Sequence, residues 1–578
     1  MPTLGDDTLT PAEVVSLARR PGATLVLDKA VEARMRRSVA ARDVLVASGE
    51  PVYGVTTGFG ASVVHQVSAA KAAELQAALI RYHLVGSGPI APDEVVRASM
   101  IIRANCLARG CSGVRPEVVR VLLELLAHDL LPVVPERGSV GASGDLVPLC
   151  YVADVVTGGG QIRQHGVLRQ ADEALADAGI QPVTLQPKEA LALINGTSFM
   201  SGFAVLAAAD AAELAVVAEA CTALAAEVLR GNRGAFAPFV HAQKPHPGQL
   251  ASAATIFRLL EGSGHCQDPS SIRSTNPDIG QADYQRLAQP IQDRYSLRCA
   301  PHVVGVLRDT TEWVDRWLGV EICSTNDNPL FDPESATVHN GGNFYGGHVA
   351  LAMDSLKVVV ASVGDLLDRQ LALVVDDKFN DGLTPNLIRP PANAAEAGLD
   401  HGFKGVQIAA SALAAEALKL GMPATAFSRS TEAHNQDKVS MGTIAARDAR
   451  AALEIVFDLA ALHLAALAQA ADLRGADRLG DGSRLAYEVV RRHVRFSDRD
   501  RRLDTEIGAL AAALRGGAMS VALGGALGDP SATVGPSATV GPSATADPSA
   551  TADPLATGGA LARVGGRSQP AAEELVHV

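Results

Sequence analysis

Small and chemically versatile residues gather in the segment GSVGASGDLVPL (residues 138–149). Its centre, Ala142-Ser143-Gly144, combines three of the smallest residues with a hydroxyl group, and Asp145 follows directly. A flexible loop would explain the glycines, and so would a turn that binds phosphate through its backbone. This segment alone leaves both interpretations open.

A second glycine-rich segment, GVTTGFG (residues 54–60), raises the same question. Neither segment contains the Gly-Lys-Ser/Thr of a phosphate-binding loop, and no pattern of alternating strands and helices surrounds them. Ser143 stands in G-A-S-G-D and not in the G-x-S-x-G of serine hydrolases. We therefore expect neither nucleotide binding nor acyl transfer by a serine.

Histidines that could bind a metal ion are isolated from one another along the chain. His83, His241, His246 and His434 belong to no HExxH motif and to no cluster of cysteines and histidines. A metal site needs three or four converging ligands. We therefore predict no metal ion.

Further motifs lie at wide spacing along the chain. They are YGVTTGFG (53–60), NGTS (195–198), QDRYSLRC (292–299), STNDNP (324–329), GNF (342–344) and EAHNQD (432–437). Together with residues 138–149, they closely resemble the aromatic amino acid ammonia-lyase family, which includes histidine, phenylalanine and tyrosine ammonia-lyases and related aminomutases. The resemblance extends from Thr10 to Leu473 and weakens after that.

The resemblance implies that Ala142-Ser143-Gly144 forms the cofactor. In this family the tripeptide cyclises and loses water to give methylidene-imidazolone (MIO), an electrophile made from the backbone itself. The amide nitrogen of Gly144 must then reach the carbonyl carbon of Ala142, and a Cβ at residue 144 would obstruct the tight turn. Ser143 supplies the hydroxyl group that leaves. We expect Asp145 to assist proton transfer, to cap a helix N-terminus, or to do both.

The resemblance also implies a reaction, the removal of ammonia from an L-α-amino acid to leave a trans-α,β-unsaturated acid. Tyr53 matches the base that removes the β-proton; because tyrosine titrates at a pKa of about 10, it needs cationic or hydrogen-bonding neighbours. Arg298 matches the residue that holds the substrate carboxylate. Tyr295 matches a residue near the electrophile. Other matches surround the prosthetic group and the substrate: Asn195, Gln292, Phe344, Glu432 and Gln436.

Two features bear on the choice of amino acid. Tyr82-His83 in LIRYHLVGSG matches the pair that sets selectivity in the family, and a histidine there can hydrogen-bond a phenol or an imidazole. HNQDKVSMG lacks the additional acidic residue that is more frequent in histidine-type relatives. We expect tyrosine first and phenylalanine second. Histidine with urocanate as product, a 2,3-aminomutase that gives a β-amino acid, and an inactive helical scaffold are the alternatives.

The composition excludes several classes of partner. The formal net charge of −13 leaves no excess of cations for nucleic acid. Seven scattered cysteines without a CxxC pair indicate reduced thiols. The N-terminus has no signal-peptide pattern, and charged residues interrupt the most apolar segments before they reach bilayer length. We therefore expect a cytoplasmic protein that does not bind membranes.

Helical patterns dominate the elements that must position these residues. With 47% hydrophobic and 4% aromatic residues, the chain is typical of a soluble helical protein. A helical hairpin is expected over 11–50, and a short strand pair near 161–169. Further helices are expected over 69–84, 93–107, 115–128, 203–230, 348–375, 406–420 and 443–473.

The predicted fold class is mainly α, a long-helix bundle with an N-terminal active-site loop region. The resemblance implies the fumarase/aspartase-like form of that bundle. We expect an N-terminal domain (1–200) that carries the prosthetic-group loop, a helical-bundle domain (201–523) and a disordered tail (524–578) with a proline-punctuated repeat. Helices that are apolar on nearly all sides favour an oligomer. The resemblance implies a homotetramer with active sites built from more than one subunit.

Overall fold

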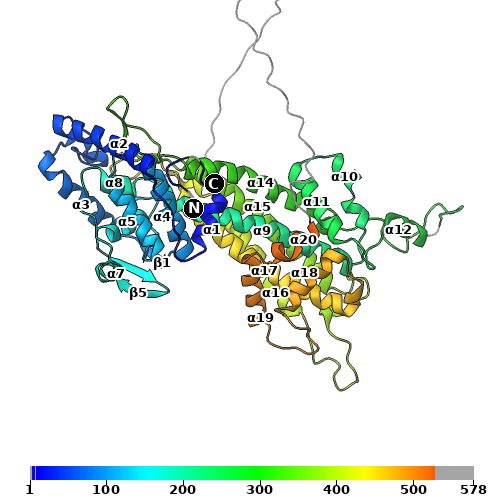
Figure 1. Cartoon of the computed structure of the whole chain (residues 1–578). Helices are drawn as coiled ribbons and strands as arrows, with labels where there is room; N and C mark the ends of the chain where they lie inside the picture. The colour runs from blue at the N-terminus through cyan, green and yellow to red at the C-terminus, as the bar shows by residue number, and fades with distance from the viewer. Residues whose placement is uncertain (1–2, 7, 277, 528–578) are drawn as a thin grey trace, which may run out of the picture. The chain divides into compact units, whose positions relative to one another are not determined.

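Four long helices form the centre of the structure. The structure is a computed structural model, and it describes residues 3–6, 8–276 and 278–527. The four helices are α9 (Ser198–Val228), α14 (Ala300–Ile322), α15 (Gly347–Val375) and α17 (Gly442–Arg474). Helix α17 packs against α9 and α15, and α14 packs against the same two helices (Figure 1). Alanine recurs along α9 and α17, so the helix axes can approach closely. The expected mainly helical architecture is confirmed.

Two of these helices require a correction to the sequence-based expectation about membranes. By length and composition alone α9 and α17 could each cross a bilayer, and the bent pair α19 and α20 passes the same test if it is taken as one segment. In α9 and α17, however, 78% of the most apolar window is buried inside the protein. Neighbouring helices therefore cover the apolar surface of both.

Helix caps set the limits of the N-terminal elements. Thr10 and Glu13 form a reciprocal capping box at the start of α1, and Asp28 accepts a hydrogen bond from Val31 N at 2.8 Å at the start of α2. Gly49 ends α2 with a left-handed φ of 77°. The N-terminal helices are α1 (Pro11–Ala18), α2 (Lys29–Ser48), α3 (Ala72–His83), α4 (Asp93–Ala108), α5 (Pro116–Ala127), α6 (Leu146–Val156), α7 (Ala171–Ala178) and α8 (Glu189–Ile194).

The strands are short, and every pair is antiparallel. Strand β1 (Ser87–Ile90) pairs with β3 (Pro135–Arg137), β6 (Leu330–Asp332) pairs with β7 (Thr337–His339), and a three-stranded sheet has the order β2-β4-β5. Its strands are β2 (Leu131–Pro132), β4 (Gln161–Gln164) and β5 (Val167–Gln170), with Gln161 opposite Gln170. The strand pair expected near residues 161–169 is therefore present.

The remaining helices all begin after α9 in the sequence, and Figure 1 shows α10, α11 and α12 on the side of the structure away from α2 and α3. They are α10 (Pro238–Ala242), α11 (Pro247–Leu259), α12 (Pro269–Thr275), α13 (Tyr295–Arg298), α16 (Lys404–Leu420), α18 (Asp481–Arg491), α19 (Asp504–Arg515) and α20 (Ala518–Leu527). Short 3₁₀ helices lie between the α-helices along the chain. Two of them, η1 (Gly60–Val64) and η2 (Ala69–Lys71), lie between α2 and α3, and the others are η3 (Arg233–Phe236), η4 (Pro385–Leu387), η5 (Ala424–Phe427) and η6 (Ala476–Arg478).

The contacts within the chain bear on the expected division into domains. The described residues form one compact unit, and the expected boundary at residue 200 falls inside α9. The first residues of the expected tail, 524–527, belong to α20. The rest of that tail, with its repeat, lies outside the described residues.

Candidate active site

The peptide Ala142-Ser143-Gly144 forms a tight turn between β3 and α6. Ser143 and Gly144 have φ angles of 51° and 77°, in the left-handed region that favours glycine. The turn rests on Gly196, whose N–H donates to Ser143 O at 3.0 Å and whose carbonyl accepts from Asp145 N at 2.8 Å. A Cβ on residue 144 would overlap the Gly196 carbonyl group. A backbone more than fifty residues away in sequence therefore excludes a side chain at this position.

Asp145 caps a helix, but not the one that it precedes. Its carboxylate makes no capping bond to α6 and accepts a hydrogen bond from Met200 N, in the first turn of α9, at 2.7 Å. The hydroxyl groups of Ser139, at 2.9 Å, and of Thr443 also donate to it. Burial raises the pKa of Asp145 to about 6, although these hydrogen bonds hold it down. The carboxylate thus fixes the turn to the starts of α9 and α17.

This raised pKa predicts a pH-dependent contribution to stability. Because the pKa of Asp145 is higher in the folded state than in the unfolded state, its stabilising contribution is fully present below pH 4 and is lost as the pH rises through about 6. Asp145→Asn removes this titration. We expect the wild-type melting temperature, relative to that of the variant, to fall between about pH 4 and pH 7, by the equivalent of about 2 kcal/mol. A difference that does not vary with pH would contradict the assignment.

A cavity of about 350 Å³ lies over the turn. Six of the residues expected in the site line it: Tyr53, Ala142, Ser143, Asn195, Phe344 and Gln436. Gln436 Nε2 donates a hydrogen bond to Ser143 Oγ at 3.1 Å. The tertiary structure thus brings together residues from five widely separated motifs. It also places an amide donor on the hydroxyl group that the resemblance marks as leaving.

Tyr53 reaches this cavity from the glycine-rich loop that precedes η1. Its hydroxyl oxygen accepts a hydrogen bond from Gly60 N at 3.0 Å. Burial raises the pKa of Tyr53 above its usual value, and the charge of Glu432 adds to the rise, while the Gly60 N–H opposes it. Glu432 is held on the same loop, because its carboxylate accepts from Ala61 N at 3.0 and 3.1 Å. Among the described residues, the Gly60 N–H is thus the hydrogen-bond donor that favours the Tyr53 phenolate, and no positive charge adds to its effect on the pKa.

Asn195 is fixed by a buried network below the cavity. Its Nδ2 donates to Asp327 Oδ1 at 3.0 Å and to the Asn328 carbonyl at 2.9 Å. Asp327 also pairs with Lys188 at 2.6 Å, and both of these side chains are fully buried. Asn195 Oδ1 is buried without a hydrogen-bond partner in the described part of the chain. The network therefore leaves one acceptor free at the edge of the cavity.

Tyr82 and His83 lie at the C-terminal end of α3, with their rings 4.3 Å apart. Tyr82 is 54% exposed, yet partial burial raises its pKa, and the nearby charges of Cys150, Tyr53 and Glu432 add to the rise. Burial lowers the pKa of His83, whose Nδ1 lies 2.9 Å from Leu79 O. Neither residue lines the cavity, but Tyr82 lies close enough to Tyr53 and Glu432 for their charges to raise its pKa.

Gln292, Tyr295 and Arg298 form a separate group around α13. Arg298 Nε donates to Asp293 O at 3.0 Å, and its guanidinium lies 4.6 Å from the centre of the Tyr295 ring. Tyr295 is 72% exposed, and Gln292 lines a different cavity, of about 260 Å³. None of these three side chains lines the cavity over the turn.

Helix α15 separates the two groups. Phe344, which lines the cavity, precedes the start of this helix, whereas Gln370 near its other end donates to the carbonyl of Ser296 at 2.9 Å. The stretch from Gly347 to Gln370 spans about 35 Å at about 1.5 Å per residue. A single chain therefore does not bring Arg298 to the Ser143 turn.

Other cavity-lining residues were not expected from the sequence: Gly141, Leu191, Asn328, Tyr345, Asn435, Asp437 and Lys438. All of them except Leu191 stand in or directly beside motifs that the sequence shows. The sequence could not identify Leu191 as a site residue, because an apolar residue in an apolar segment indicates only burial. Among the described residues, no group of three or more His, Cys, Asp or Glu side chains could hold a metal ion.

Comparisons with known proteins show the family to which the chain belongs. The model of the family described as aromatic amino acid lyase matches residues 9–492. A histidine ammonia-lyase of Caldanaerobacter subterraneus subsp. tengcongensis is 38% identical over 511 residues, which cover 88% of this chain and 96% of that protein. A tyrosine ammonia-lyase of Cupriavidus metallidurans is 40% identical over 530 residues, with coverage of 90% and 97%.

A solved structure shares the fold. The X-ray structure of tyrosine aminomutase from Streptomyces globisporus has a TM-score of 0.85 at 36% identity, and the match covers 91% of this chain and 98% of that one. The helical fold and the matching relatives define an enzyme, a carbon–nitrogen lyase. The chain belongs to the aromatic amino acid lyase family.

Proposed function

We propose that this protein is an MIO-dependent ammonia-lyase that converts an L-aromatic amino acid, with tyrosine favoured over phenylalanine, to a trans-cinnamate-type acid and ammonia. The observation that carries the proposal is the Ala142-Ser143-Gly144 turn, which is clamped on Gly196 and faces a cavity lined by Tyr53. No residue other than glycine fits at position 144.

The turn has the properties that the prosthetic group requires. Positive φ at Ser143 and Gly144 bends the backbone tightly, and Gln436 contacts the hydroxyl group that would leave. Asn195 adds a free acceptor at the cavity edge. When formed, methylidene-imidazolone supplies an electrophile towards the substrate amine.

The side chains around the cavity take the other roles. Tyr53 removes the β-proton of the substrate through its phenolate, which the Gly60 N–H stabilises. Phe344 packs beside the prosthetic group, while Glu432 and Gln436 form the polar wall towards the amine. Tyr82 and His83 contact the substrate ring; neutral His83 then meets the phenolic hydroxyl of tyrosine.

Arg298, Tyr295 and Gln292 complete the site in a homotetramer, in which a neighbouring subunit supplies them. The separation along α15 supports this assignment, because a rigid helix prevents one chain from closing the distance. An arginine that arrives from another subunit also explains how the pKa of Tyr53 can fall, since a nearby cation favours the phenolate. We also propose that the enzyme is water-soluble, because protein covers most of the apolar windows of α9 and α17, and cytoplasmic, because its seven scattered cysteines form no CxxC pair.

Co-assembly of two inactive variants tests the shared site. Tyr53→Phe and Arg298→Ala each inactivate the homomer, but their equal co-expression is expected to restore about one quarter of wild-type turnover, the statistical share of sites that take both intact residues. Tyr295→Phe with Arg298→Ala is the matched control, because these two side chains touch and belong to one half-site. Equal recovery in both pairs, or none in either, would contradict the shared site.

A substrate panel distinguishes the proposal from its alternatives. The purified protein is incubated with tyrosine, phenylalanine and histidine, and near-ultraviolet absorbance records the unsaturated acid. Release of urocanate from histidine alone would establish a histidine ammonia-lyase, and a β-amino acid in the product mixture would establish an aminomutase. An intact mass without the loss of two waters, together with no turnover, would favour an inactive scaffold.

A further inference from the structure

Helix α8 is a six-residue element whose residues are all buried, and it ends on the residues that hold the turn. Asn195 follows it directly, with its N–H bonded to Leu191 O at 2.8 Å, and Gly196 comes next. A six-residue helix has too few internal hydrogen bonds to hold itself. Its position must therefore come from contacts outside it.

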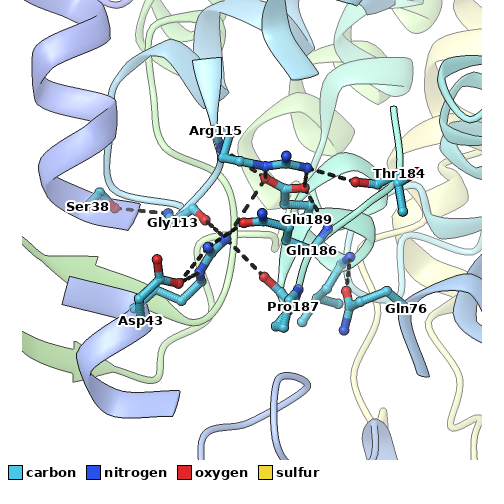
Figure 2. A network of polar contacts seen from close by, with 11 residues as sticks. Ser38, Asp43, Gln76, Gly113, Arg115, Thr184, Gln186, Pro187 and Glu189 are labelled. Carbon is cyan, nitrogen blue, oxygen red and sulfur yellow. Dashed lines mark hydrogen bonds and ion pairs between the residues drawn. The ribbon is translucent and has the colours of Figure 1, made fainter. Parts of the chain in front are cut away.

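A polar network fixes the start of α8 (Figure 2). The carboxylate of Glu189 accepts from Arg115 Nε and Nη2 at 2.8 and 2.7 Å, and also from the backbone N–H groups of Arg115 and Gln186. Arg42 of α2 donates to Gln186 Oε1 at 3.0 Å and to the Pro187 carbonyl at 3.2 Å. Bidentate pairs of this kind restrict orientation as well as distance.

Gln76 of α3 bonds both to α8 and to the loop that carries Tyr53. The side chain is fully buried, and its Oε1 accepts from Leu191 N at 3.2 Å (Figure 2). Because it lies in the first turn of α8, Leu191 N has no partner within the helix. Gln76 Nε2 donates to the carbonyl of Gly54, the residue after Tyr53, at 3.0 Å. One amide thus joins the loop that carries Tyr53 to the helix that leads to Asn195.

The loop that carries Tyr53 also packs tightly against α8. A Cβ on Gly54 would lie 2.5 Å from Leu191 Cδ2, so the loop backbone lies directly on the Leu191 side chain. Leu191 in turn lines the cavity. Gln76 stands six residues before Tyr82 on the same helix, so its two bonds also set α3 against the loop and α8.

From these contacts we propose that Gln76 is a positioning residue for the reaction: it holds the Tyr53 loop at a set distance from the turn that carries Ser143. The inference rests on the proposed function. Gln76 does not line the cavity, and it acts through Gly54 and Leu191. A displacement of about 1 Å in a reacting group can cost about 100-fold in rate.

Gln469 provides a matched control. It is a buried glutamine of α17, and its amide also bonds backbone groups on other segments. Its Oε1 accepts from Ser497 N at 3.0 Å, and its Nε2 donates to Ser497 O at 2.9 Å and to Leu387 O at 3.4 Å. It stands about 40 Å along α17 from Gly442, where the helix starts beside the turn. Replacing either glutamine with methionine removes the same two kinds of bond from a buried position.

The test compares Gln76→Met with Gln469→Met on the substrate that the wild type converts best. The value of kcat is expressed per chain that carries the two-water mass loss, so incomplete cofactor formation does not enter. We expect Gln76→Met to lower kcat by about 10- to 100-fold with KM changed by less than about threefold, because the carboxylate-binding residues are elsewhere. Gln469→Met should keep kcat within about twofold, although both variants lower the melting temperature.

Gln76→Glu gives a second measurement, which decides the question even if Gln76→Met does not fold. A protonated carboxyl can accept from Leu191 N and donate to Gly54 O, whereas a carboxylate cannot donate. The ratio of variant to wild-type kcat should therefore rise as the pH falls. A Gln76→Met variant that loses no more kcat than Gln469→Met, or a Gln76→Glu ratio that does not rise, overturns the inference. A wild type without turnover and without the mass loss overturns the proposed function itself.

Discussion

Replacing Ser143 with alanine is expected to lower turnover by at least about 10³-fold, the size of effect seen when a catalytic unit loses an indispensable member. Alanine cannot release the hydroxyl group from which the exocyclic alkene forms. Intact-mass spectrometry should show the wild-type chain two waters lighter than its sequence and the variant at full mass apart from the substitution. The absorbance assay with the preferred substrate measures the loss of activity.

The fold should survive this change, because, of the residues that the structure describes, Ser143 Oγ hydrogen-bonds only with the Gln436 amide, and the bonds that hold the turn come from the backbone. Melting temperature and oligomeric state should therefore match the wild type. Ser48→Ala on α2 is the control, since that hydroxyl group bonds only locally, to Leu45 O and Glu50 N. A Ser143→Ala protein that keeps its activity, or keeps the mass loss, would disprove the cofactor assignment.

Tyr53→Phe is expected to lower kcat by about 10²- to 10⁴-fold, the usual contribution of a general base, while the two-water mass loss is retained. The mass loss therefore distinguishes Ser143→Ala, which cannot form the cofactor, from Tyr53→Phe, which forms the cofactor but lacks the base. The wild-type rate should increase with pH as the phenolate forms, over a range set by burial, which raises the pKa of Tyr53, and by the neighbouring subunit's arginine, which lowers it. The residual rate of the variant should lack this rise.

Tyr151→Phe is a closely matched control for Tyr53→Phe. The Tyr151 hydroxyl accepts a backbone hydrogen bond from Gly86 N at 3.0 Å, as Tyr53 does from Gly60 N. Tyr151→Phe therefore loses the same kind of bond outside the cavity, and we expect its kcat to stay near that of the wild type. Similar losses of kcat in the two variants would show that the hydrogen bond, and not the base, accounts for the effect.

Much of the fold follows from local pattern. The helix expected over 348–375 is present as α15 (Gly347–Val375), and that expected over 443–473 as α17 (Gly442–Arg474). Long runs of alanine and leucine favour helix whatever surrounds them. Helix α14 (Ala300–Ile322) was not expected, since its charged residues and two tryptophans lack that composition. Its apolar face is recognised as a buried helix face only in the tertiary structure, where α9 and α15 pack against it.

The sequence by itself determined which residues are candidates for the chemistry. Ala142-Ser143-Gly144, Tyr53 and Arg298 stand in motifs that resemble those of the family, and the roles that this resemblance implies stay predictions. Only the tertiary structure decided that Gly196 excludes a side chain at residue 144 and that α15 keeps Arg298 away from the turn in one chain. Both are contacts between segments far apart in the sequence. No local pattern records such contacts, since they depend on how rigid helices pack.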